Sequence, residues 1–244
     1  MKVLPVPKKF STPLASPFYP EPPYHYKNSR VLLAMFNPSE SSVKKMLPAP
    51  LRPSQMPLAA LFFGEHPCKE IGTFKEAALI VQCLFDNQIT GEEEVGAYFS
   101  HVYVDTDIAL ASGREIWGYA RKNADISLTL KKNRVEASVV RNGHPLIKAS
   151  CLLDEEGAWI DSGPNINFKV IPSASGESHD IAEVTAAYLT INVHDGRSGD
   201  VDIEIKSGPQ DDFSAVKIDS IMLGQYFDCD FVVPPGKVVG KLKL

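Results

Sequence analysis

The fold class is decided by the run ISLTLKKNRVEASVV, residues 126–140. Apolar and polar residues alternate over 126–131 and again over 134–140, which is the two-residue period of a half-buried β-strand. Lys132 and Asn133 separate the two runs, at the spacing of a two-residue hairpin turn. The pattern therefore predicts an antiparallel hairpin and places the chain among the β-rich proteins.

Strand patterns continue on both sides of this hairpin, with few helices between them. Strands are predicted at 31–36, 58–63, 77–85, 95–104, 146–153, 168–172, 184–193, 201–205 and 227–233, and residues 214–223 fit either a strand or a helix. A short helix is predicted after Ser39, ending before Pro48, and another over 107–115. These elements predict a β-dominated α+β fold, a large and mostly antiparallel sheet curled into a barrel-like core with few flanking helices.

The N-terminal segment, residues 1–28, differs from the rest because it is rich in proline. Seven prolines lie between Pro5 and Pro23. Such a sequence favours an extended arm that wraps over the body or over a neighbouring subunit. The composition does not change in the middle of the chain, so we expect residues 1–244 to form a single domain that carries this arm.

Charge and targeting signals exclude two classes of partner. The formal net charge is -5 at pH 7, whereas a protein that binds nucleic acid normally carries a basic face. The N-terminus lacks the apolar segment of a signal peptide, and no apolar run approaches the roughly 20 residues of a membrane span. We therefore expect a cytoplasmic protein without nucleic-acid or membrane partners.

Cysteine and histidine spacing does not indicate a metal site. The four cysteines are far apart and form no C-x-x-C pair, which fits buried thiols in a reducing compartment. The six histidines form no H-x-x-x-H or H-x-H motif. His66 stands two residues before Cys68, which is a weak signal because metal sites need three or four converging groups. We expect no metal and no cofactor, and we interpret the histidines as surface or core residues.

The segment that carries chemistry is GREIWGYARK, residues 113–122. Two cations, Arg121 and Lys122, directly follow an apolar and aromatic run. Desolvation and a neighbouring positive charge both favour the neutral form of a lysine amine. A neutral amine attacks a ketone and forms an imine, or Schiff base, which then accepts electrons from the substrate. The alternative from spacing alone is a solvated Arg-Lys pair at the start of a strand.

The same segment resembles the signature of the acetoacetate decarboxylase family, which runs Gly-Arg-Glu, a few apolar residues, Tyr or Phe, then Pro-Lys-Lys. Further matching positions are spread over nearly the whole chain: Ser11 to Leu14, Pro23-Tyr24, Asn28, Leu47-Pro48, Gly72, Phe74, Glu76, Tyr103, Asp105, Pro164-Asn165, Lys169, Ile171-Pro172 and Pro234. The resemblance implies a barrel-like, mostly antiparallel sheet, a homo-oligomer, and a decarboxylase, a carbon–carbon lyase that acts on a small β-keto acid or related organic acid.

The departures from the family pattern fall on its chemistry. The imine-forming lysine of the family corresponds to Arg121, and a guanidinium cannot form an imine. Lys122 takes the place of the helper lysine, and neighbouring residues on a strand point to opposite faces. Ala120 replaces the family's proline, so a bulge there would turn Lys122 inward. We predict Lys122, Arg121 and Glu76 as catalytic residues.

Other pocket positions are retained or changed. Tyr119 is retained, whereas the pocket arginine that directly follows asparagine in the family is here displaced to Arg30, and Phe62 stands where the family has a glutamate. The substrate-binding residues implied by the resemblance are Tyr119, Arg30, Phe62 and Trp117. The ordinary alternatives stay open: core packing for Tyr119 and a simple salt bridge for Arg121.

Three hypotheses follow for the function. The first is a decarboxylase that uses Lys122 as the imine former. The second is an enzyme of the same fold that uses Arg121 and Glu76 without an imine, for dehydration, aldolase-type or isomerase chemistry on a keto acid. The third is a non-catalytic protein that binds a small acid.

Overall fold

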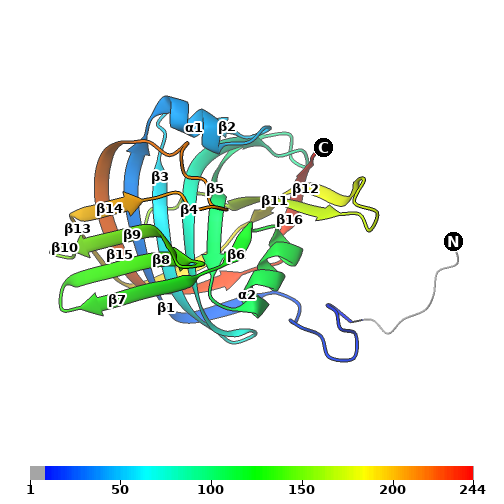
Figure 1. The fold of residues 1–244 in the computed structure, drawn as a ribbon, viewed down its shortest axis with the longest axis horizontal. Helices are drawn as coiled ribbons and strands as arrows, with labels where there is room; N and C mark the ends of the chain where they lie inside the picture. The colour runs from blue at the N-terminus through cyan, green and yellow to red at the C-terminus, as the bar shows by residue number, and fades with distance from the viewer. Residues whose placement is uncertain (1–8, 244) are drawn as a thin grey trace, which may run out of the picture.

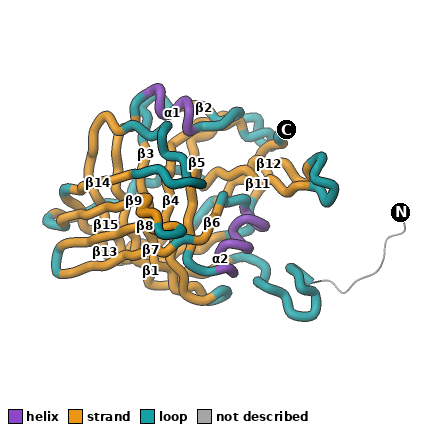
Figure 2. Tube along the Cα trace, viewed as in Figure 1, coloured by secondary structure: helices purple, strands orange, loops and turns teal. Residues whose placement is uncertain are grey.

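The structure is a computed structural model that describes residues 9–243. Its fold consists mostly of strands (Figures 1 and 2). The strands are β1 (Tyr24–Pro38), β2 (Arg52–Pro53), β3 (Ala59–Cys68), β4 (Gly72–Asp86), β5 (Glu93–Val104), β6 (Arg121–Asn123), β7 (Asp125–Lys131), β8 (Arg134–Arg141), β9 (His144–Leu152), β10 (Glu155–Glu156), β11 (Asn165–Pro172), β12 (His179–Ala187), β13 (Thr190–Gly199), β14 (Val201–Ile205), β15 (Ile218–Val233) and β16 (Lys237–Lys241). The helices are α1 (Glu40–Met46) and α2 (Asp107–Ser112), and α2 continues into a π-helical turn, η1 (Gly113–Trp117).

The strands form a large sheet and a small one. The large sheet has twelve strands, with the main path β10-β13-β15-β1-β3-β4-β5-β11-β12-β16, while β2 pairs with β4 and β6 pairs with β5. The small sheet has the order β14-β9-β8-β7. Most pairs are antiparallel, and β5 has parallel pairs with β6 and β11. The predicted fold class is confirmed, although the large sheet is curled and its path stays open, so it is not a closed barrel (Figure 1).

The predicted hairpin over residues 126–140 is present as β7 and β8. Leu128 lies opposite Ala137, and both point to the buried face. Lys132 adopts φ 57°, the left-handed backbone conformation that a tight primed hairpin turn requires. The strand pairing and the turn conformation therefore both confirm the predicted antiparallel hairpin.

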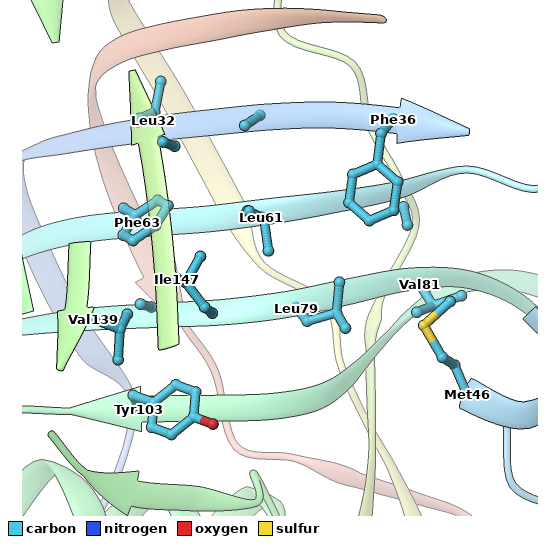
Figure 3. Close-up of a cluster of buried hydrophobic side chains, with 14 of the residues drawn as sticks. Leu32, Phe36, Met46, Leu61, Phe63, Leu79, Val81, Tyr103, Val139 and Ile147 are labelled. Carbon is cyan, nitrogen blue, oxygen red and sulfur yellow. The ribbon is translucent and has the colours of Figure 1, made fainter. Parts of the chain in front are cut away.

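The main core lies between the small sheet and one face of the large sheet (Figure 3). Leu32 of β1, Leu61 of β3 and Leu79 of β4 are fully buried on this face. Val139 of β8 and Ile147 of β9 pack against them from the small sheet. Because side chains alternate across a strand, the next residues of β1, β3 and β4 point to the opposite face, where the candidate site lies.

Several segments differ from the predicted boundaries. The apolar run 184–193 was expected as one strand, but β12 ends at Ala187 and β13 begins at Thr190. The strand predicted at 58–63 continues to Cys68, and the ambiguous segment 214–223 enters β15 at Ile218. The first eight residues of the predicted arm lie outside the described residues. Within residues 9–243, no helix is long and apolar enough to cross a membrane.

Candidate active site

A cavity of about 160 Å³ opens on the face of the large sheet that points away from the main core. A cavity of this size holds a benzene-sized molecule. Its wall includes residues that point to the same face of three neighbouring strands. They are Leu33 and Met35 of β1, Ala60 and Phe62 of β3, and Glu76, Ile80 and Gln82 of β4. Strand periodicity thus builds a largely apolar chamber with few polar groups.

The main polar feature of the chamber is a buried ion pair between Arg121 and Glu76. Arg121 Nη2 lies 2.7 Å from Glu76 Oε2, and the two side chains are 4% and 7% exposed. Arg121 Nη1 donates to the carbonyl oxygen of Ala109 at 2.7 Å, while Nε has no hydrogen-bond partner among the described residues. The pair therefore keeps a fixed charge in a buried site and leaves Nε of the guanidinium without a partner among the described residues.

Local structure determines where Arg121 points. Arg121 is the first residue of β6, which runs parallel to β5, and Val102 of β5 is its partner. The guanidinium carbon lies 5.6 Å from the ring centre of Phe74 and 5.1 Å from that of Tyr119, so both rings stabilise the cation. A side chain on Gly113 would collide with it, since an added Cβ would lie 2.4 Å from Arg121 Nη1. The glycine of the GRE segment therefore makes room for the guanidinium.

Burial changes the acidity of the groups around this ion pair. Desolvation raises the pKa of Glu76 above its usual value, and the charge and hydrogen bond of Arg121 offset part of this rise. Burial likewise raises the pKa of Tyr119 to about 12, so its phenol stays protonated. The Tyr119 hydroxyl accepts a hydrogen bond from Asn165 Nδ2 at 2.7 Å. The site thus combines a fixed cation, an acid that binds its proton more tightly than usual, and a phenol.

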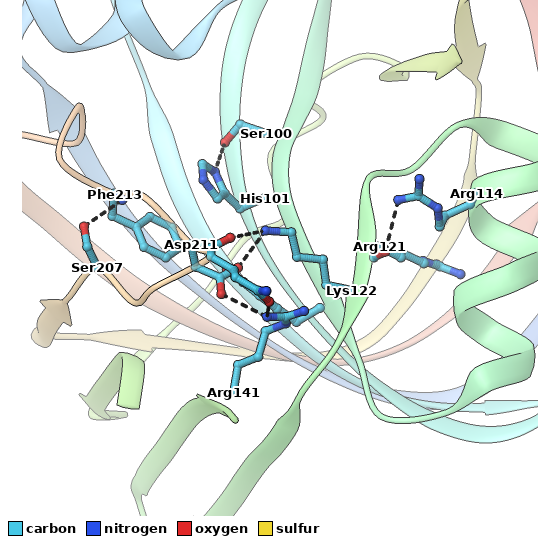
Figure 4. A network of polar contacts seen from close by, with 11 residues as sticks. Ser100, His101, Arg114, Arg121, Lys122, Arg141, Ser207, Asp211 and Phe213 are labelled. Atoms are coloured by element: carbon cyan, nitrogen blue, oxygen red, sulfur yellow. Dashed lines mark hydrogen bonds and ion pairs between the residues drawn. The ribbon is translucent and has the colours of Figure 1, made fainter. Parts of the chain in front are cut away.

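Lys122 lies outside the cavity, which corrects the expectation that a bulge turns it inward. Its Nζ lies 2.8 Å from Asp211 Oδ1 and donates to the carbonyl oxygen of Gln210 at 2.7 Å. Arg121 and Lys122 project to opposite sides of β6 (Figure 4). The physical reason is strand alternation, because β6 is regular at these residues and Asp211 holds the ammonium on the far side.

Ion pairs with Lys122 and Arg141 hold Asp211 on that side (Figure 4), and none of these three residues is part of the cavity lining. Asp211 is buried and accepts hydrogen bonds from Lys122, from Tyr103 at 2.9 Å and from Arg141 at 3.3 Å. Burial raises the pKa of Asp211, but these three donors outweigh it and leave the pKa below its usual value. Lys122 thus has a structural partner that accounts for its position.

Arg30 is also placed outside the cavity, contrary to its expected role in substrate binding. Its Nη2 lies 2.7 Å from Glu65 Oε1 in a partly exposed ion pair. The register of β1 shifts between Tyr26 and Ser29, and Asn28 adopts φ 55°. This irregularity turns Ser29 inward, where it is fully buried, and turns Arg30 outward.

The remaining predicted residues line the cavity. They are Tyr119, Phe62 and Trp117, together with Arg121 and Glu76. Trp117 Nε1 donates to the carbonyl oxygen of Pro234 at 2.8 Å, so its indole packs in the wall with its polar group satisfied. Sequence reasoning missed Tyr26 and His66, which also line the cavity. The missed signal is the spacing of Phe62, Gly64 and His66, which share one face once β3 is extended.

The described residues show neither an amine in the cavity nor a cluster of metal ligands. No lysine of residues 9–243 lines the cavity, and Arg121 is the one permanent cation in its wall. Within the same residues, no group of three or more His, Cys, Asp or Glu side chains is arranged to hold a metal ion.

Comparisons with known proteins agree on one family. Residues 7–242 match the acetoacetate decarboxylase family. The acetoacetate decarboxylase of Clostridium acetobutylicum is 22% identical over 243 residues, covering 95% of each chain. A crystal structure of acetoacetate decarboxylase from Legionella pneumophila has a TM-score of 0.82 at 23% identity, covering 98% of this chain and 93% of that one. The enduracididine biosynthesis enzyme MppR, complexed with pyruvate, has a TM-score of 0.83 at 17% identity, covering 97% and 99%.

Proposed function

Since this chain belongs to the acetoacetate decarboxylase family, we propose that it is an enzyme that forms and protonates the enolate of a small keto acid without a lysine imine. The observation that carries this proposal is the buried Arg121–Glu76 pair in a cavity with no lysine in its described wall. A guanidinium remains charged and cannot form an imine, so the electron sink has to be electrostatic.

Decarboxylation of a β-keto acid illustrates the chemistry. The bond between the α-carbon and the carboxylate breaks, carbon dioxide leaves, and the electron pair moves through the α-carbon to the keto oxygen. The positive charge of Arg121 and the hydroxyl of Tyr119 stabilise the negative charge that develops on that oxygen. Glu76 takes up a proton from solvent, gives it to the α-carbon and returns to the carboxylate that pairs with Arg121; desolvation raises the pKa of Glu76, which favours this proton uptake.

The same enolate is the intermediate of enolisation and of retro-aldol cleavage, so the proposal names a class of reaction. Glu76 acts as a base in the first of these, where its carboxylate removes the α-proton. The solved complex of MppR with pyruvate supports a keto acid as the ligand class, since the two proteins share a fold. We further propose a cytoplasmic homo-oligomer, whose subunit number light scattering measures.

The test is enolate formation, measured separately from product formation. We would incubate the protein in deuterated water with a panel of α- and β-keto acids, follow α-hydrogen exchange by NMR, and follow products by mass spectrometry. Glu76→Gln is expected to slow exchange about a hundredfold to ten-thousandfold. Lys122→Met, on the opposite side of β6, is the matched control and is expected to leave exchange within about twofold of the wild type.

Borohydride trapping tests the absence of an imine. The wild type with a keto acid is expected to give no covalent adduct, whereas Arg121→Lys places an amine in the same dry site and serves as the positive control. A substrate-dependent adduct on the wild type would overturn the imine-free mechanism. Saturable binding of keto acids with neither exchange nor product would show a non-catalytic binding protein.

A further inference from the structure

His66 lies inside the candidate site because Gly64 leaves room for its ring. Phe62, Gly64 and His66 point to the cavity face of β3. A Cβ added to Gly64 would lie 2.2 Å from His66 Nε2 and 2.6 Å from Cε1. The Nε2 edge of the imidazole therefore lies directly over the backbone of Gly64.

This edge lies beside the Arg121–Glu76 pair. Gly64 is the partner of Glu76 in the pairing of β3 with β4. Side chains of directly paired residues point to the same face, with Cβ atoms about 5 Å apart. His66 Nε2, which occupies the side-chain position of Gly64, is therefore a neighbour of the Glu76 side chain. Arg121 is close enough for its charge to help lower the pKa of His66.

Hydrogen bonding fixes the tautomer of this imidazole. His66 Nδ1 lies 3.0 Å from Ser29 Oγ, and Ser29 is fully buried. A hydroxyl has one hydrogen, and within residues 9–243 Ser29 Oγ has no acceptor other than His66 Nδ1. A buried hydroxyl hydrogen without an acceptor is costly, so Ser29 donates to Nδ1. Burial, with the Arg121 charge, lowers the pKa of His66 to about 3, so the ring is neutral and its one hydrogen is on Nε2.

The Nε2–H group has no hydrogen-bond partner within residues 9–243. His66 is 3% exposed and borders the cavity, and its Nε2 makes no hydrogen bond among the described residues. Tyr26, Phe62, Phe74 and Phe231 surround the ring and hold its orientation. A nearly buried donor that is held in place and left unpaired is available to a ligand.

We infer that His66 is a ligand-binding residue that donates an Nε2–H hydrogen bond to a carbonyl or carboxylate oxygen held at the Arg121–Glu76 pair, with Ser29 as the positioning residue. The ligand class rests on the proposed function, while the tautomer and the free donor rest on the Ser29 contact and on the burial of the ring. A neutral imidazole polarises a carbonyl oxygen without adding a second charge beside Arg121, as the histidine of triosephosphate isomerase does for its substrate.

The first experiment determines the tautomer by ¹⁵N NMR of the histidine side chains near neutral pH. The spectrum of His66→Gln assigns the signal among the six histidines. We expect an unprotonated Nδ1 and a protonated Nε2 in the wild type, and a mixture of tautomers in Ser29→Ala. A hydrogen on Nδ1 of the wild type would overturn the inference, whatever the protein catalyses.

The second experiment measures the binding of pyruvate as the probe ligand, by calorimetry and by the shift of the His66 Nε2–H signal. His66→Phe fits the surrounding rings without a donor and is expected to weaken binding about tenfold. His66→Gln keeps a donor and is expected to stay within about threefold of the wild type. Equal affinity of the wild type and a folded His66→Phe, with an unmoved Nε2–H signal, would refute the role of His66.

The two proposals fail in different ways. If pyruvate shifts the Nε2–H signal and binding needs the donor, but no keto acid exchanges hydrogen, the binding role stands and the enzymatic proposal fails. If keto acids exchange hydrogen equally fast in the wild type and in His66→Phe, the enzymatic proposal stands and the inference about His66 fails. Should His66→Phe not fold, the wild-type tautomer and the response of the wild-type Nε2–H signal to pyruvate still decide the matter.

Discussion

The buried imidazole of His66 makes the stability of the protein depend on pH below about pH 6.5. In the unfolded chain a histidine has its ordinary pKa of 6.5, whereas burial lowers the pKa of His66 to about 3 in the folded protein. Between these values the unfolded chain binds a proton that the folded protein does not bind. The free energy of unfolding therefore falls as the pH falls through this window. Above about pH 6.5 the histidine is neutral in both states, so His66 causes no such loss.

The size of this effect follows from the two pKa values. One unit corresponds to about 1.4 kcal/mol, and at about pH 5 the unfolded histidine is almost fully protonated while the folded one is neutral. Between about pH 7 and about pH 5, His66 alone therefore lowers the free energy of unfolding by about 2 kcal/mol. For a chain of this length, that is a shift of roughly 4–8 °C in the unfolding temperature.

Urea unfolding of the wild type and of His66→Gln at both pH values measures this contribution. Other titrating groups are common to both proteins, so the difference between their pH dependences isolates His66. The wild type is expected to lose about 2 kcal/mol more than His66→Gln. His144→Gln, at the exposed start of β9, is the matched control and is expected to behave like the wild type. Equal pH dependence in the wild type and His66→Gln would refute the argument that His66 is buried and neutral.

Two further predictions concern a buried charge and a glycine. Arg121→Met leaves Glu76 without its counter-charge and is expected to cost about 3–5 kcal/mol in urea unfolding, much of which Arg121→Met/Glu76→Gln recovers; equal losses in the single and double variants would contradict this. Gly118→Ala adds a Cβ that would lie 2.7 Å from Lys169 Cα at φ 79°, so it is expected to lower thermal stability by more than about 1 kcal/mol. Gly143→Ala shares φ 79° but has open space, so a loss as large as that of Gly118→Ala would argue against the role of the collision.

The strands could be predicted because their alternation follows from burial on one face, but their ends and partners could not. Residues 126–131 and 134–140 are predicted from this period, whereas 31–36 and 77–85 are predicted as apolar runs; the four segments lie within β7, β8, β1 and β4. The run 184–193 carries one continuous pattern, yet it contributes to β12 and β13, which lie in different parts of the sheet. Periodicity describes which face a residue occupies and contains no information about which strand is its neighbour.

Side-chain directions in the candidate site could be predicted on regular strands, where side chains alternate between the two faces. The prediction failed where the backbone is irregular. Adjacent residues of a strand point to opposite sides, which predicts that Arg121 and Lys122 do so, and in the structure they lie on opposite sides of β6. The irregularity of β1 near Asn28 exchanges the directions of Ser29 and Arg30, and a left-handed residue of this kind has no reliable signal in one sequence. The extension of β3 to His66 crosses Gly64, which lowers strand propensity but here provides the space that the imidazole needs.

Arg121 stands where the family resemblance places the imine-forming lysine, and under the proposed function it supports electrostatic rather than covalent catalysis, because hydrogen bonds as well as charge hold the guanidinium in place. Nη1 is bound to Ala109, Nη2 is bound to Glu76, and Gly113 provides the space, so the cation cannot move without losing buried hydrogen bonds. Side-chain alternation points Arg121 inward and Lys122 to the opposite side of β6, so among the described residues no lysine lies in the cavity wall. The cavity combines a preorganised cation whose Nε is unpaired among the described residues, an acid with a raised pKa and a neutral imidazole, which together suit stabilisation of an oxyanion rather than formation of a covalent bond.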